Sequence, residues 1–137
     1  MVSLLEYHLK RRKMNPRDLE NRFLEFLAQN KYLSQKALFS IKHLPNGRIV
    51  SNRSDFFNVW DIIALKSNHT YLFQICSGTT YNEHVRKINE LFPFTTEPFQ
   101  YIVYYFKPKS KWEFTLHLRT EIGWLLSPVE QLIDNTV

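Results

Sequence analysis

Two short apolar runs on either side of a polar turn predict a β-hairpin near the middle of the chain. Residues 61–65 and 71–77 are rich in apolar and β-branched side chains, and residues 66–69 supply turn formers between them. Asp61 opens the first strand, and Gln74 interrupts the second strand with a polar side chain that needs a partner. Two interpretations stay open. Asp61 caps a turn while Gln74 bonds to backbone, or the two hold a divalent cation against a phosphate.

The rest of the pattern predicts a single α/β domain over residues 1–137, without repeats or low-complexity segments. Asn15-Pro16 is a typical start for a helix reaching about residue 29 or 30, and Thr80 is expected to cap a second helix that ends before Pro93. The expected strands are the two of the hairpin, an extended segment over 32–43, and residues 99–106 and 112–118. Residues 1–14 form a basic N-terminal segment, and 121–137 a C-terminal extension with a short strand or helix.

The first helix places a carboxylate inside its apolar arc. Glu20 falls among the apolar side chains when residues are spaced by about 100°. A buried carboxylate is costly unless a cation or metal meets it. Glu20 therefore either pairs with Arg17 or Lys36 at the helix edge or joins Asp61 in one site. The apolar members of the arc are Leu19, Phe23, Leu24, Phe26 and Leu27.

The second helix carries His84 on its inner face and Lys87 at the border of that face. A histidine in such a position is more often a satisfied core residue than a catalyst, and a lysine at a helix border is usually solvated. Lys87 is nonetheless the nearest candidate for a cation over the hairpin. Cys76 lies among apolar residues, where a cysteine is usually inert.

Charge and composition narrow the classes of partner. The net charge of +5 and 44% hydrophobic content describe a folded basic protein, which favours nucleic acid first and acidic membranes or proteins second. No apolar run is long enough for a membrane span, and the N-terminus lacks a signal-peptide pattern, so we expect a cytoplasmic protein without a membrane partner. The single cysteine, Cys76, excludes a disulfide within the chain and a cysteine-rich zinc site.

Residues 59–64, Val-Trp-Asp-Ile-Ile-Ala, followed by residues 73–77, Phe-Gln-Ile-Cys-Ser, resemble the core of the PD-(D/E)XK nucleases. The chain is most similar to archaeal Holliday junction resolvases and small archaeal or viral relatives. The resemblance covers roughly residues 15–106. It implies a restriction-endonuclease-like core, with a central mixed sheet of four to five strands flanked by helices. For a viral protein, the implied location is the host cytoplasm.

The resemblance also implies roles for individual residues. Asp61 matches the metal-binding aspartate, Gln74 the second acidic position, and Glu20 the glutamate of the first helix, and together they would bind Mg²⁺ or Mn²⁺. The family's catalytic lysine is replaced by Cys76. Either a cation from elsewhere, such as Lys87, Arg86 or Lys42, takes its place, with Lys87 the named catalytic candidate, or the site is weakened or inactive. The residues expected to contact DNA are Arg48, Ser51, Arg53, Ser54, Lys42, Ser77, Lys10, Arg11 and Arg12.

The expected function is therefore metal-dependent endonucleolytic hydrolysis of DNA, structure-specific or resolvase-like, by a chain that can form a homodimer. The aromatic residues near Phe56, Phe57 and Trp60 belong either to that interface or to the core. Two alternatives remain. One is a DNA-binding protein that keeps the nuclease scaffold without catalysis, which the missing lysine favours. The second is a structural or interaction protein in which the hairpin is only part of a sheet.

Overall fold

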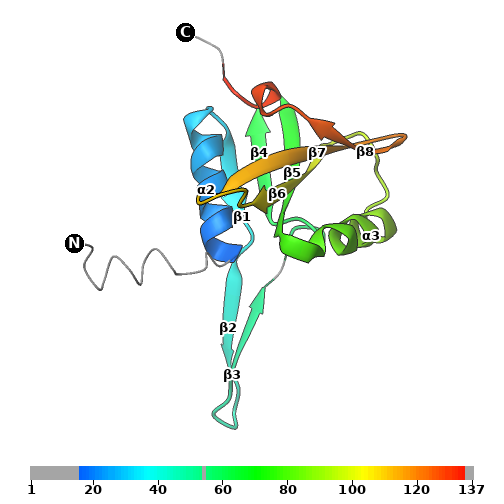
Figure 1. Ribbon diagram of the computed structural model, residues 1–137. Coiled ribbons are helices and arrows are strands. Elements are labelled where there is room, and N and C mark those ends of the chain that lie inside the picture. Colours follow the sequence, from blue (N-terminus) through cyan, green and yellow to red (C-terminus); the bar gives the residue numbers. More distant parts are fainter. Residues whose placement is uncertain (1–15, 54, 135–137) are drawn as a thin grey trace, which may run out of the picture.

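The computed structural model describes residues 16–53 and 55–134, and its architecture is α/β (Figure 1). A mixed six-stranded sheet has the strand order β1-β4-β5-β6-β7-β8, and a separate two-stranded ribbon joins β2 to β3. Two single-turn 3-10 helices, Gly78–Thr80 and Val129–Gln131, follow β5 and β8. The helices and strands are α2 (Pro16–Gln29), β1 (Leu33–Lys36), β2 (Phe39–His43), β3 (Ile49–Arg53), β4 (Ile62–Lys66), β5 (His69–Ser77), α3 (Tyr81–Leu91), β6 (Phe99–Phe106), β7 (Glu113–Thr120) and β8 (Gly123–Ser127).

The central hairpin is present where the apolar pattern predicts it. β4 and β5 pair antiparallel, with Ile62 opposite Phe73 and Lys66 opposite His69. The two connecting residues, Ser67 and Asn68, both adopt left-handed backbone angles, with φ of 52° and 65°. Two consecutive residues with positive φ form the type I′ turn that matches the twist of paired strands. A polar Ser-Asn pair is therefore sufficient to reverse the chain here.

The two helices cover opposite faces of the sheet. α2 packs Leu19, Phe23 and Leu27 against one face, and α3 lies on the other face, where Ile88 and Phe92 pack (Figure 1). α3 is also the crossover between β5 and β6, which are the only parallel pair among the described strands. Strands at the centre of a sheet covered on both sides have little solvent-facing surface. This explains why β5 is buried almost continuously from its fourth residue onward.

The sheet has six strands rather than the four to five expected from the sequence. The two strands at the edges account for the difference. β1 is the short first part of the extended segment 32–43 and pairs with β4, whereas the second part, β2, leaves the sheet. β8 comes from the C-terminal extension and pairs with β7. Leu125 and Leu126 of β8 are both exposed, so this strand lacks the alternation that identifies a half-buried strand in a sequence.

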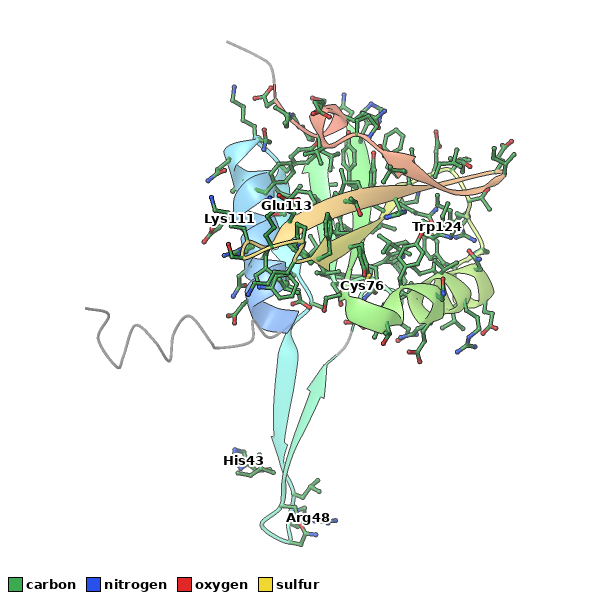
Figure 2. The ribbon with its side chains drawn as sticks, in the orientation of Figure 1. His43, Arg48, Cys76, Lys111, Glu113 and Trp124 are labelled. Carbon is green, nitrogen blue, oxygen red and sulfur yellow. The ribbon has the colours of Figure 1, made fainter. Side chains whose placement is uncertain are left out.

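The β2–β3 ribbon projects from the body of the molecule (Figure 1). It leaves the sheet where β4 begins. A hydrogen bond fixes its root there, since the backbone N–H of Ala37 donates to the carbonyl of Asp61 at 2.8 Å. The predicted turn at residues 45–47 forms its tip, with Gly47 at φ 83°. Figure 2 shows His43 and Arg48 near this tip. The chain therefore carries a two-stranded arm rooted beside Asp61.

A buried arginine holds the segment after α3 against the sheet. Arg119 on β7 is 8% exposed, and its Nη1 donates to the carbonyls of Phe92 and Phe94 and to Oε1 of Gln100, at 3.1, 2.7 and 2.9 Å. Gln100 in turn donates to the Phe94 carbonyl at 2.9 Å. Burial lowers the pKa of Arg119. Charge-assisted bonds to three oxygens compensate for this desolvation.

Replacing this arginine is expected to destabilise the fold. Arg119→Met would leave the Phe92 carbonyl and Oε1 of Gln100 without this donor, at a cost of about 2–4 kcal/mol in the free energy of unfolding. Urea denaturation measures the change. The matched control is Arg86→Met, because Arg86 forms an exposed pair with Glu90 and its loss should cost no more than about 0.5 kcal/mol. Equal effects of the two substitutions would contradict the role assigned to Arg119.

Candidate functional site

A hollow of about 310 Å³ lies at the C-terminal end of β5, between the first turns of the two helices. Figure 2 shows Cys76 in this region, close to the start of α3. The first turns of α2 and α3 present the partial positive ends of both helix dipoles to it. The side chains around it come from α2, the segment before β4, β5 and α3. They are Leu19, Glu20, Asp55, Asp61, Gln74, Ile75, Cys76, Ser77, Thr80 and His84.

Asp61 is buried and held at the root of the hairpin. It is 4% exposed, and its Oδ2 accepts hydrogen bonds from the backbone N–H of Ile75 and from Nε2 of Gln74, both at 2.8 Å. Its own backbone N–H donates to the carbonyl of Phe73 at 3.0 Å. The carboxylate therefore bridges β4 to β5, and its position is set by backbone as well as by a side chain.

Gln74 finds the partners that a polar residue inside an apolar strand requires. Its Nε2 donates to Oδ2 of Asp61 and also to the carbonyl of Ile75 at 3.3 Å. The nitrogen side of the amide thus faces Asp61, and the Oε1 side faces away. A cation shared by Asp61 and Gln74 would need the amide to turn over, because only its oxygen is a metal ligand.

Asp55 is a residue of the hollow that the sequence analysis did not single out. A tight reversal brings it close, because Phe56 and Trp60 exchange backbone hydrogen bonds of 2.9 and 3.0 Å. Residues 55 and 61 flank this pair and so come to adjacent positions across the reversal. Phe57 and Asn58 adopt φ of 53° and 66° within it. A left-handed phenylalanine is strained, and such strain concentrates at functional sites.

Glu20 lies in the same hollow as Asp61, on the side formed by α2. It is 4% exposed, in agreement with its position inside the apolar arc of the helix. Lys36, one of the two partners considered for it from the sequence, donates from Nζ to Oδ1 of Asn21 at 2.9 Å. The geometry thus brings a carboxylate from α2 and a carboxylate from the start of β4 to one place.

His84 and Cys76 bring neutral groups to the hollow. Burial lowers the pKa of His84, the charge of Lys87 lowers it further, and the carboxylates of Glu83 and Asp55 act in the opposite direction. Burial, reinforced by Asp61, raises the pKa of the Cys76 thiol to about 12. At neutral pH the imidazole is uncharged and the thiol is protonated. Cys76 therefore cannot supply the positive charge of the lysine that the resemblance to the nucleases would imply at this position.

The remaining candidates lie in several places. Lys87 is exposed on α3 and is not among the residues that line the hollow, whereas Ser77 is one of them. Arg48 is exposed just before β3, and Lys42, Ser51 and Arg53 occupy positions on the ribbon strands. The others, Ser54, Lys10, Arg11 and Arg12, lie outside the described residues.

The donor set of the hollow suits a hard cation. Carboxylate and amide oxygens are the ligands that Mg²⁺ and Mn²⁺ accept, and Mg²⁺ is commonly held by one or two carboxylates with water and substrate phosphate completing its shell. Asp61, Glu20 and a reoriented Gln74 meet that requirement. Across residues 16–53 and 55–134, no three or more His, Cys, Asp or Glu side chains form a ready-made metal cage. Water and substrate would supply the other ligands.

No protein-family model matches this chain, and a search of curated proteins finds none similar to it. In the described part of the chain, neither helix is long and apolar enough to cross a membrane.

Substitutions at Asp61 are expected to separate its structural from its chemical role. Asp61→Ala removes the acceptor of two buried hydrogen bonds, so we expect a loss of about 1–3 kcal/mol in the free energy of unfolding. Asp61→Asn keeps an oxygen that can accept from Ile75 and Gln74, so this variant should lose less free energy of unfolding than Asp61→Ala. Chemical denaturation of the two variants beside the wild type tests this order. A stability of the alanine variant equal to that of the wild type would contradict it.

The pKa of His84 also predicts how stability depends on pH. A histidine whose pKa is lower in the folded state than its usual 6.5 binds more protons when unfolded, so its contribution is present above pH 6.5 and is lost as the pH falls below it. We expect the free energy of unfolding to decrease between pH 7.5 and 5.5. His84→Gln should reduce this decrease, whereas His43→Gln, at an exposed position of the ribbon, should not. An unchanged decrease in His84→Gln would refute the assignment.

Proposed function

We propose that this protein is a metal-dependent DNA endonuclease with a restriction-endonuclease-like core. The observation that carries the proposal is the hollow at the end of β5, where the buried carboxylates of Asp61 and Glu20 meet beside Gln74. Carboxylate oxygens that converge from different elements are the ligands that a divalent ion takes, and such an ion is the partner whose chemistry suits a phosphodiester. The order of helix, hairpin, crossover helix and strand around a mixed sheet supports the proposed core.

In this mechanism each residue of the hollow has a distinct task. Asp61 and Glu20 would hold the cation, and Gln74 would join them through Oε1 if its amide turned over. A bound Mg²⁺ or Mn²⁺ would supply a water molecule of lowered pKa and positive charge to offset the phosphate. His84, uncharged at neutral pH, accepts a proton from the attacking water as its oxygen bonds to phosphorus. The phosphorus–oxygen bond to the leaving strand breaks, and the departing oxygen takes a proton from solvent.

The cation that replaces the family's lysine is proposed to be Lys87. Its side chain is exposed on α3, three residues after His84, and its charge acts on that imidazole. A long, flexible ammonium on this helix can reach toward the phosphate when DNA binds. The Cys76 thiol is protonated at neutral pH and adds no charge to the hollow.

The ribbon is the proposed DNA-binding arm. The sequence from Phe26 to Ser54 contains no acidic residue, and the ribbon lies within it. A two-stranded antiparallel ribbon fits the major groove of DNA, and lysine and arginine on it neutralise phosphates. Because the ribbon is rooted beside Asp61, DNA held by the arm would pass the mouth of the hollow. The basic residues of this stretch are Lys31, Lys36, Lys42, Arg48 and Arg53.

A homodimer is part of the proposal, because cutting both strands of a junction needs two sites. Trp60 is wholly buried, which removes it from the aromatic residues considered for the interface. Phe57 is 66% exposed, next to Leu91 and Phe94, which are also exposed around an apolar groove. These three side chains are the proposed contact between subunits.

The second candidate function is DNA binding without catalysis. Two observations favour it over a purely structural role. Cys76 is a neutral thiol where the resemblance implies a lysine, and the uncharged Gln74 stands where it implies a second acid, so a nuclease-like site here would offer less negative charge to a dication. The ribbon and the net charge of +5 would retain affinity for DNA whether or not the site is active.

A cleavage assay separates the two functions. Linear duplex, single-stranded and four-way-junction DNA are incubated with Mg²⁺ or Mn²⁺ and with wild type or Asp61→Asn. The nuclease predicts metal-dependent cutting by the wild type that falls at least 100-fold in the variant, because the substitution removes the ligand charge while its oxygen still accepts from Ile75 and Gln74. Retained DNA binding without cutting by either protein would support the scaffold and reject the nuclease.

The substitution Cys76→Lys independently tests whether the hollow is where DNA is cut. The substitution places the family's cation into the hollow beside Asp61, so an active nuclease should cut DNA several-fold faster or at lower metal concentration. Ser110→Lys adds the same charge in the exposed loop between β6 and β7 and should leave the cutting rate unchanged. Equal rates for both lysine variants would contradict the assignment of this hollow as the site.

A further inference from the structure

A second cleft lies on the other side of the short turn that closes the candidate site. Its volume is about 280 Å³. Ser77 and Thr80 of the turn line the acidic hollow, whereas Gly78 and Thr79 line the cleft. None of the cleft's side chains carries a formal charge at neutral pH, so it does not suit a phosphate or a metal ion. The lining residues are Gly78, Thr79, Tyr81, Asn82, Tyr104 and His117.

The walls of the cleft are aromatic rings from three elements. The rings of Tyr81 on α3 and His117 on β7 have centroids 4.8 Å apart, and Tyr81 meets Tyr104 of β6 edge to face at 6.0 Å. The Tyr104 hydroxyl donates to the carbonyl of Gly78 at 3.2 Å, which ties this wall to the turn. All three rings are only partly buried, so their remaining surface is open to a ligand.

The imidazole of His117 is held in place by two hydroxyl groups. Its Nδ1 lies 3.2 Å from the hydroxyl of Tyr81, and its Nε2 lies 3.1 Å from the hydroxyl of Thr115. Burial lowers the pKa of His117, which favours the uncharged ring at neutral pH. A fixed, uncharged aromatic surface loses little entropy when a planar ligand stacks on it.

Strand register connects the cleft to the candidate site. Cys76 of the hollow is paired with Tyr104, and Tyr104 with Thr115. Two residues along each strand, Gln74 is paired with Ile102, and Ile102 is paired with His117. Neighbouring strands lie about 4.8 Å apart. The aromatic wall thus begins one strand away from the hollow, which is within the reach of a single nucleotide.

We propose that this cleft binds an unpaired DNA base beside the phosphate held at the hollow. The proposal rests on the proposed nuclease function and specifies its substrate as DNA with a single-stranded segment. Bases stack on aromatic side chains without regard to sequence, and a base paired inside a duplex cannot enter such a cleft. Thr79 and Asn82 are exposed at the rim, where their side chains can hydrogen-bond to the base edge.

The test uses short single-stranded DNA that carries 2-aminopurine, a base whose fluorescence changes on stacking. Binding to wild-type protein should change this fluorescence, and a fully abasic strand of the same length should bind about 10-fold more weakly than the intact strand. This comparison needs no variant, so it does not depend on how a substitution folds. Equal affinity for the intact and abasic strands, or unchanged fluorescence on binding, would overturn the proposal.

The variant Tyr104→Leu tests whether the preference for intact over abasic strands comes from this cleft. The substitution keeps an apolar side chain on β6 but removes the ring, and it should reduce affinity for the intact strand to that for the abasic strand. Trp112→Leu removes a partly buried aromatic ring that packs with the core cluster under α2, whereas Tyr81 and Tyr104 pack with the cluster under α3, so it serves as the control and should bind like the wild type. Equal affinities of the two variants for the intact strand would place the stacking elsewhere and reject this cleft.

The same samples show which proposal fails. Metal-dependent cutting that is lost in Asp61→Asn, with no preference for intact over abasic strands, rejects the cleft alone. Stacking in the cleft without cutting in either metal supports base binding and rejects the nuclease. Absence of any binding to single-stranded DNA rejects the cleft, and absence of binding and cutting with every DNA rejects both.

Discussion

The carboxylate of Asp61 joins the two strands on which the candidate site depends. A single oxygen accepts from the backbone of Ile75 and from the amide of Gln74, so the start of β4 is fixed to the end of β5. The carbonyl of the same residue accepts from Ala37 at the root of the ribbon. Hydrogen bonds to this one residue thus fix the hairpin, one wall of the hollow and the root of the ribbon. This is also why its structural and chemical roles must be separated by an isosteric substitution.

The distribution of charge gives the molecule two different surfaces. The hollow gathers the carboxylates of Glu20, Asp55 and Asp61, while the long stretch that contains the ribbon has basic residues and no acidic ones. Under the proposed function, the basic arm would attract an anionic polymer, and a cation in the hollow would lie between its carboxylates and a phosphate. Cys76 and His84 are uncharged at neutral pH and add no negative charge there.

Much of the fold was predictable from local patterns. Two apolar, β-branched runs and the turn formers at residues 66–69 indicated the hairpin, and the Asn15-Pro16 start and Pro93 stop indicated the helices with nearly correct ends. The edge strands were less evident, because β1 has only four residues and β8 exposes two leucines. Short edge strands form through pairing with a neighbour that is distant in sequence, and a local pattern does not record that neighbour.

The sequence by itself determined which residues are costly to bury: a carboxylate in the apolar arc of a helix, an aspartate at the start of a strand and a glutamine inside another. Only the tertiary structure decided that Glu20, Asp61 and Gln74 share one hollow, that Asp55 and His84 join them, and that an aromatic cleft lies across the turn. The physical reason is distance along the chain. Hydrophobic periodicity reports the environment of each residue, whereas their meeting depends on strand register and on a left-handed reversal at Phe57 and Asn58.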